Sequence, residues 1–222
     1  LGKYEGWYAV RDECYYQEKE LIKKKGKYFA PSGAECEWLK EESHFFKLSQ
    51  WQDKLLQHYK NNPDAIAPKS RYNEVISFIS SGLKDLSISR KTVKWGIKVP
   101  NDEEFTIFVW LDALQNYQSA LNYPDINNDL YKSFWKESLH VVGKDILRFH
   151  AVYWPAFLMA ANLKPPKRIY SHGWWTKDSQ KISKSLGNAI DPYEVVNKFG
   201  LDQFRYFLFR EVPFGEDGDF SE

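Results

Sequence analysis

Three short apolar segments, separated by two helical patterns, constrain the fold of the second half of this chain more than any other feature. The segments Thr106–Trp110, Leu139–Val142 and Arg168–Ser171 have the length and composition of buried strands. Residues 112–121 and 145–161 repeat apolar side chains every three to four residues, which is typical of helices. Strands that alternate with helices predict a parallel sheet with right-handed crossovers.

The first half of the chain has a different rhythm. Residues 1–36 alternate aromatic with charged side chains, which indicates short strands, loops and a brief helix. From Glu41 to Tyr59, apolar side chains recur at helical spacing and predict an amphipathic helix. Residues 75–79 predict a second helix, closed by Gly82. We therefore expect an α+β module in this part of the chain.

These patterns together predict an α/β fold in three parts. An inserted α+β module with its linker would occupy residues 1–104, and the second half of a parallel-sheet domain residues 105–189. A helical extension would start at residue 190, where Asp191 and Pro192 form a helix start signal. The single methionine is Met159, so we expect the sequence to be a piece of a longer protein.

Composition excludes several classes of protein. A net charge of +1 gives no basic surface from which nucleic-acid binding could be argued. The two cysteines, Cys14 and Cys36, form no Cys-x-x-Cys pair, so no structural zinc site is expected. Free thiols in a reducing compartment are favoured, although a disulfide stays open. No signal peptide opens the chain and no apolar run approaches the roughly 18 residues of a membrane span. We therefore expect a cytoplasmic protein without membrane contact.

The residues that follow the strand Leu139–Val142 form the first candidate site. Gly143 would let a ligand approach the backbone, and Lys144 and Asp145 open a helix whose N-terminus favours anions. Asp145 could accept hydrogen bonds from the hydroxyl groups of a ribose. The alternative is that Asp145 only caps its helix.

A second candidate is the segment Lys181-Ile182-Ser183-Lys184-Ser185. Two lysines three residues apart, among serines and near Gly187, suit a loop that closes on a polyphosphate. Their ammonium groups would neutralise charge that develops on a leaving pyrophosphate. The alternative is an ordinary solvated loop.

A third candidate is an aromatic pocket. Trp110, Ala113 and Tyr117 lie at helical spacing, and His150 and Trp154 form an i, i+4 pair on the long helix. Such a cluster could hold a flexible apolar side chain such as a thioether. Core packing is the alternative for each of these residues taken singly.

Taken together, these segments resemble one family. Residues 181–185 resemble the Lys-Met-Ser-Lys-Ser loop of class I aminoacyl-tRNA synthetases, with Ile182 in place of Met. Further blocks are similar to methionyl-tRNA synthetases in particular: Tyr4–Tyr8, Ser81–Arg90, Trp95–Ile97, Trp110–Ala113, Gly143–His150, His172–Trp175 and Gly200–Asp202. The resemblance extends over essentially the whole chain in the same order. It implies a Rossmann-like catalytic domain with a connective insertion and a helical stem-contact region.

The resemblance also implies a role for each candidate residue. Positions that line the methionine pocket are matched by Trp110, Ala113, Tyr117, Ile146, His150 and Trp154. Positions near the adenosine of ATP are matched by Gly143, Asp145 and Trp175. Lys181 and Lys184 match the lysines that contact ATP and stabilise the transition state of methionyl-adenylate formation. Methionine, ATP with Mg²⁺ and tRNA(Met) are the implied ligands, and the implied parent enzyme is a monomeric methionine–tRNA ligase.

The sequence also departs from that family. The His-Ile-Gly-His element and an anticodon-binding domain are absent, so this piece alone is expected to be inactive. The segment Pro31–Cys36 lacks the cysteine knuckles that many members carry, and Leu114 stands where some have proline. Two rival functions stay open: a non-catalytic module that binds methionine or tRNA, and a class I synthetase for another amino acid.

Overall fold

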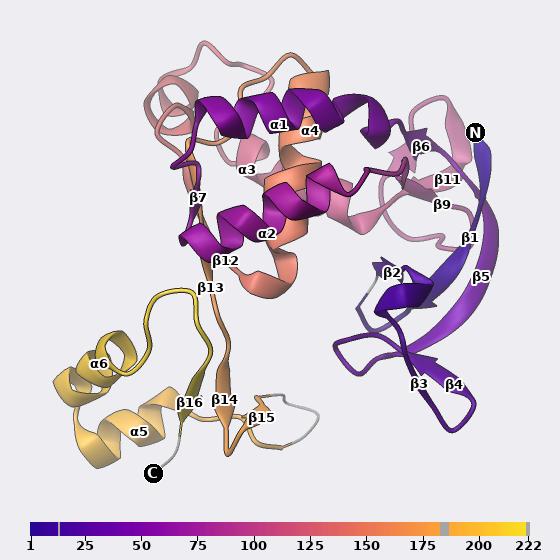
Figure 1. Cartoon of the computed structure of the whole chain (residues 1–222). Coiled ribbons are helices and arrows are strands. Elements are labelled where there is room, and N and C mark those ends of the chain that lie inside the picture. Colours follow the sequence, from indigo (N-terminus) through magenta and orange to yellow (C-terminus); the bar gives the residue numbers. More distant parts are fainter. Residues whose placement is uncertain (13, 183–186, 221–222) are drawn as a thin grey trace. The chain divides into compact units, whose positions relative to one another are not determined.

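The computed structural model describes residues 1–12, 14–182 and 187–220 (Figure 1). The chain forms two compact units, each of which is discontinuous in sequence. Unit 1 comprises residues 1–51 and 83–120, and unit 2 comprises residues 52–82 and 121–222. Each unit is described by itself.

Unit 1 contains an antiparallel sheet of five strands in the order β2-β1-β5-β4-β3. Its long strands are β1 and β5, which pair from Gly2 with Ser43 to Tyr8 with Glu37. A small core of Ala9, Ala30, Ala34 and Cys36 is covered by aromatic side chains. The elements are β1 Gly2–Ala9, β2 Cys14–Tyr16, the 3₁₀ helix η1 Glu18–Glu20, β3 Ile22–Lys24, β4 Lys27–Phe29 and β5 Glu35–Ser43.

The remainder of unit 1 is built from short strands and one helix. The strands β10, β11 and β9 form a second antiparallel sheet, and β6 pairs with β8. A buried ion pair between Arg90 and Glu41, both less than 10% exposed, joins β9 to β5. The elements are β6 Phe45–Phe46, η2 Leu48–Trp51, β8 Leu86–Ser87, β9 Ser89–Arg90, β10 Lys98–Val99, β11 Asp102–Ile107 and the helix α3 Val109–Ser119.

Unit 2 contains a parallel sheet in the order β12-β13-β7. Helical turns connect β12 to β13, and α1 and α2 lie side by side (Figure 1). The Tyr59 hydroxyl of α1 donates a hydrogen bond to the Ala151 carbonyl over 2.5 Å, which anchors this helix pair. The elements are α1 Gln52–Asn61, β7 Ile66–Ala67, α2 Lys69–Ser80, the π-helix η3 Tyr131–Trp135, β12 Leu139–Gly143, the 3₁₀ turn η4 Lys144–Ile146, the π-helix η5 Phe149–Tyr153, α4 Trp154–Ala160 and β13 Arg168–His172.

The last part of unit 2 is a small sheet with two helices, in the strand order β15-β14-β16. Asp191 accepts a hydrogen bond from the Tyr193 backbone N–H, as its expected capping role requires. Gly200, with a φ of 95°, separates the two helices, because this conformation is easy only for glycine. The elements are β14 Trp175–Lys177, β15 Gln180–Lys181, α5 Pro192–Phe199, α6 Leu201–Arg210 and β16 Gly218–Phe220.

The predicted α/β class is confirmed in its coarse form, but two sequence expectations about elements are wrong. The segment Thr106–Trp110 is not a strand of the parallel sheet: β11 ends at Ile107 and pairs antiparallel, and Trp110 already belongs to α3. A short apolar run fits a strand and a buried helical turn equally well, so its pattern could not decide. The helix expected from Glu41 begins only at Gln52, since β5 and β6 occupy part of that segment.

The third strand of the parallel sheet is β7, which has only two residues and gave no sequence signal. The boundaries of the compact units also differ from the boundaries after residues 104 and 189 that we expect between the functional parts. The functional division therefore stays a prediction.

Candidate nucleotide and amino-acid site

The carboxyl end of β12 carries the first predicted site. Gly143 ends the strand and the 3₁₀ turn Lys144–Ile146 follows at once. A Cβ atom on Gly143 would lie 2.6 Å from Oδ1 of Asp145, too close for any real contact. A side chain at Gly143 would therefore displace the Asp145 carboxylate from its present position.

The carboxyl end of β13 lies beside this turn. In the parallel register Gly143 is paired with His172, so both strands end at the same edge of the sheet. The indole Nε1 of Trp174 donates a hydrogen bond to Oδ1 of Asp145 over 3.2 Å. Asp145 is exposed, which leaves its carboxylate able to accept further hydrogen bonds from a ligand.

Asp217 holds both Lys144 and Trp174 at this edge of the sheet. Its Oδ2 lies 2.6 Å from Nζ of Lys144, and its Oδ1 accepts the Trp174 backbone N–H over 2.9 Å. Nζ of Lys144 also lies 4.3 Å from the centroid of the Trp174 ring. Desolvation alone would raise the pKa of Asp217, but the bonds from Lys144 and Trp174 outweigh it and hold that pKa below its ordinary value. The carboxylate therefore stays ionised and keeps Lys144 and Trp174 in place.

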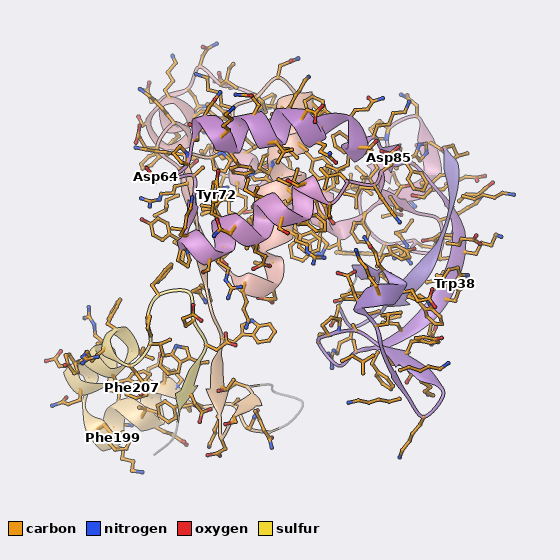
Figure 2. The ribbon with its side chains drawn as sticks, viewed as in Figure 1. Trp38, Asp64, Tyr72, Asp85, Phe199 and Phe207 are labelled. Carbon is orange, nitrogen blue, oxygen red and sulfur yellow. The ribbon has the colours of Figure 1, made fainter. Side chains whose placement is uncertain are left out.

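Sequence reasoning missed both Trp174 and Asp217. Trp174 lay inside a recognised block, but the role near the nucleotide was given to its neighbour Trp175. The structure packs the Trp175 ring against Phe207 of α6, with ring centroids 5.4 Å apart; Phe207 is labelled in Figure 2. Asp217 lies 73 residues beyond Lys144, and no local pattern marks it.

The predicted lysine loop begins at Lys181, the last residue of β15. Lys181 belongs to β15, where its backbone pairs with Thr176 of β14. Asp219 of β16 accepts hydrogen bonds from the Thr176 hydroxyl and from the Ser179 backbone N–H, and both bonds lower its pKa. This aspartate therefore anchors the turn that precedes the loop. Lys184 lies outside the described residues.

Half of the predicted aromatic pocket lies in unit 2. His150 is 3% exposed, and its Nδ1 lies 2.9 Å from the carbonyl oxygen of Ile146. The carbonyl oxygen can only accept, so Nδ1 carries a proton and Nε2 carries the lone pair of the neutral ring. Trp154, one turn further along, is 2% exposed. Ile146, His150 and Trp154 thus share one helical stretch, whose π-helical turn shifts the side-chain spacing at His150.

A second histidine lies next to His150. The ring of His140 on β12 meets the ring of His150 edge to face, with centroids 6.0 Å apart. Desolvation, together with a smaller effect of the nearby His150, lowers the pKa of His140 to about 4. Desolvation also lowers the pKa of His150, against the opposing effect of the Ile146 carbonyl. Both rings are therefore neutral at physiological pH.

The other half of the predicted pocket lies in unit 1. Trp110, Ala113 and Tyr117 occupy successive turns of α3 and share one face of it. Trp110 and Tyr117 are half-buried, Ala113 is exposed, and burial raises the pKa of the Tyr117 hydroxyl. The structure therefore brings the six predicted pocket residues into two groups of three, one in each unit.

Three further features of the described residues concern metal ligands, thiols and the length of the helices. Within residues 1–12, 14–182 and 187–220, no group of three or more His, Cys, Asp or Glu side chains could hold a metal ion. Cys36 is a buried free thiol, and desolvation raises its pKa. Among the described helices, none has the length and apolarity that crossing a membrane requires.

Comparison with known proteins places this chain in a family. The model for class I tRNA synthetases (M) matches residues 8–222. Methionine–tRNA ligase of Rickettsia bellii (strain RML369-C) is 65% identical over 99% of this chain and 42% of its own length. The ligase of Brucella suis biovar 1 (strain 1330) is 56% identical over 99% of this chain and 43% of its own length.

A solved structure agrees with these sequences. The crystal structure of Mycobacterium tuberculosis methionyl-tRNA synthetase bound by methionyl-adenylate matches with a TM-score of 0.92 and 49% identity. The match covers 100% of this chain and 44% of that one. The chain therefore spans less than half the length of the relatives that it matches.

Proposed function

Because this chain belongs to the class I tRNA synthetases of the methionyl type, we propose that it supplies the second part of the catalytic region of a methionine–tRNA ligase. The complete enzyme activates methionine with ATP to methionyl-adenylate and transfers it to the 3′ end of tRNA(Met). The observation that carries this proposal is the sheet edge at which Gly143, Asp145 and Trp174 meet. In open α/β sheets, ligands bind beyond the carboxyl ends of the parallel strands.

The parallel sheet of unit 2 is, in this proposal, the second half of a Rossmann-like domain. Residues 1–104 serve as the connective insertion and its linker, and residues 190–222 start the helical stem-contact region. The complete domain also needs the missing segment that binds the triphosphate from the opposite side, so this piece alone forms no adenylate.

Asp145 holds the ribose of ATP. Its carboxylate is exposed, and the Trp174 indole fixes its orientation. A carboxylate that is already oriented accepts hydroxyl hydrogen bonds without an added ordering cost. Gly143 has no side chain, so the nucleotide can approach the protein backbone at this position. In this proposal Trp175 lies near the adenine.

Methionine occupies the aromatic pocket. His150 and Trp154 of unit 2 offer a neutral, buried surface with Ile146. Trp110, Ala113 and Tyr117, which share one face of α3 in unit 1, stay predicted methionine contacts. A thioether is apolar and polarisable, so aromatic rings bind it well without a charged partner. Neutral histidines avoid the desolvation cost that an imidazolium would add to such a pocket.

Lys181 and Lys184 act on the phosphates. Their ammonium groups stabilise charge on the leaving pyrophosphate while the methionine carboxylate attacks the α-phosphate. No side chain becomes a covalent nucleophile, since positioning and charge stabilisation carry the rate.

Mg²⁺ accompanies ATP in this proposal. Of the two carboxylates at the site, Asp217 is paired with Lys144 and Asp145 is proposed for the ribose, so they do not build a cage of their own. This donor set fits an ion that is held largely through ATP phosphates, where it would neutralise their charge. The buried free thiol of Cys36 supports a reducing location, the cytoplasm, and the complete enzyme is taken to be a monomer.

Product analysis tests the proposal. The full-length protein that contains this chain is incubated with methionine, ATP, Mg²⁺ and tRNA(Met), and acylated tRNA is measured. Methionyl-tRNA is the expected product. A non-catalytic module would bind these ligands without acylating tRNA, and a synthetase of other specificity would attach another amino acid; either result would overturn the proposal.

A further inference from the structure

The loop between β9 and β10 presents a tryptophan to solvent. Trp95 is 90% exposed, more than any other large hydrophobic side chain in the described ranges. Indole rings are normally buried or half-buried, so one held in water needs an explanation.

The loop is firmly anchored, so the exposure of Trp95 is not a result of a loose segment. The Thr106 hydroxyl donates a hydrogen bond to the Val93 carbonyl over 2.7 Å, and the Ile107 N–H donates to the Ile97 carbonyl over 2.7 Å. Gly96 has a φ of 129°, and a Cβ atom on it would lie 2.7 Å from the Thr106 methyl group. The backbone on both sides of Trp95 is thus held against β11, and the indole projects outward.

Lysines flank this ring. Residues 91–98 contain three lysines and no acidic residue. Lys91 is neutralised by Glu42 and Glu104, whereas Lys98 donates a hydrogen bond to the Thr106 hydroxyl over 3.2 Å. In the part of the chain that the structure describes, Lys94 has no ion-pair partner. An exposed aromatic ring beside available ammonium groups is the combination that single-stranded nucleic acids recognise, by base stacking and by phosphate contact.

We propose that Trp95, with Lys94 and Lys98, binds the unpaired 3′ end of tRNA, with a terminal base stacked on the indole. The identity of the RNA rests on the proposed function, whereas the stacking surface rests on the loop alone. Unpaired RNA fits better than a duplex, because only unstacked bases offer a free face to an aromatic ring.

The test compares variants of the full-length protein. Trp95→Ala and Trp95→Phe are measured for equilibrium binding of tRNA(Met) and of the same tRNA without its unpaired 3′ nucleotides. Trp38→Ala is the matched control, since Trp38 is also an exposed indole of unit 1, 54% exposed on β5 (Figure 2). Thermal unfolding and methionine-dependent pyrophosphate exchange, which need no tRNA, are recorded for each variant.

Trp95→Ala is expected to raise the Kd for intact tRNA roughly tenfold, the effect of losing one stacked base. Trp95→Phe should restore most of the affinity, Trp38→Ala should leave it unchanged, and truncated tRNA should not distinguish Trp95→Ala from the wild type. Lys94→Ala should weaken binding less, and its effect should shrink as salt rises.

Three outcomes would overturn the inference. Trp95→Ala could leave tRNA affinity unchanged, or weaken intact and truncated tRNA equally. It could also lower the melting temperature and pyrophosphate exchange together, which would mean that another part of the protein covers the indole. Failure of the proposed function is recognised separately: a wild-type protein without methionine-dependent exchange overturns that function, whatever Trp95 does.

Discussion

The indole Nε1 of Trp174 and the Oδ1 of Asp145 lie 3.2 Å apart and join the ends of two parallel strands. The bond orients the carboxylate that we propose for the ribose of ATP. Asp217 in turn holds Trp174 through its backbone N–H and pairs with Lys144. The nucleotide side of the site therefore depends on residues that do not themselves need to touch the nucleotide.

Removing the Asp145 carboxylate should weaken ATP binding. Asp145→Ala is expected to raise the KM for ATP about tenfold or more, since a hydrogen bond to a charged group contributes about 1.5–3 kcal/mol. Trp174→Phe should raise it less, about two- to tenfold, because the carboxylate remains and only its orientation is lost. Pyrophosphate exchange at varied ATP concentration measures both. An unchanged KM in Asp145→Ala would contradict the ribose role.

His150 should affect methionine rather than ATP. His150→Ala removes a buried neutral ring from the proposed pocket, and the KM for methionine is expected to rise about tenfold or more while kcat changes little. Pyrophosphate exchange at varied methionine concentration provides the measurement, with varied ATP as the internal comparison. A large fall in kcat at constant KM would place His150 outside the pocket.

Lys184 should affect turnover rather than binding. Lys184→Ala is expected to lower kcat about a hundredfold with little change in the KM for methionine, because its charge is needed mainly in the transition state. Lys60→Ala, an exposed lysine at the end of α1, is the control for the loss of one positive charge. If Lys184→Ala turns over at the wild-type rate, the proposed role of the loop is wrong.

The buried histidine His140 should make stability depend on pH. In the unfolded chain the His140 imidazole binds a proton at pH values below its ordinary pKa of 6.5. In the folded protein its pKa is lowered to about 4, so the ring stays neutral until the pH falls to about that value. Between these values the unfolded state binds more protons. The free energy of unfolding should therefore fall as pH drops from 6.5 towards 4, by up to about 1.4 kcal/mol per pH unit. His150, whose pKa is also lowered, adds to this fall.

Urea unfolding of the full-length protein at pH 7 and pH 5 measures this dependence. His140→Gln removes the titrating group and should make the difference between the two pH values smaller, whatever it does to the absolute stability. An equal pH dependence in the variant and the wild type would mean that His140 is not the buried neutral group described above.

Apart from the start of the helix expected from Glu41, sequence patterns predicted the helices well, because helical periodicity and end signals are local. The helix start at Asp191, the stop at Gly82 and the helical run after Gly143 are all confirmed. The strand pairing was harder to predict. A two-residue strand such as β7 has no periodicity, and the apolar run that ends at Trp110 fitted a strand or a helix equally well.

The candidate site was predictable only in part, for a related reason. Gly143, Asp145 and His150 lie in one continuous segment, so one local pattern could suggest them together. Asp217 directly precedes β16, far along the chain from this segment. Only folding brings its carboxylate within 2.6 Å of Nζ of Lys144. Trp174 and Trp175 are adjacent and chemically identical, so which ring reaches Asp145 depends on the strand end and not on composition.

ATP–pyrophosphate exchange by the full-length protein, measured with each amino acid in turn, tests the central claim most directly. Rapid exchange with methionine and negligible exchange with the others is the predicted result. Exchange that is absent, or that depends on another amino acid, would contradict it.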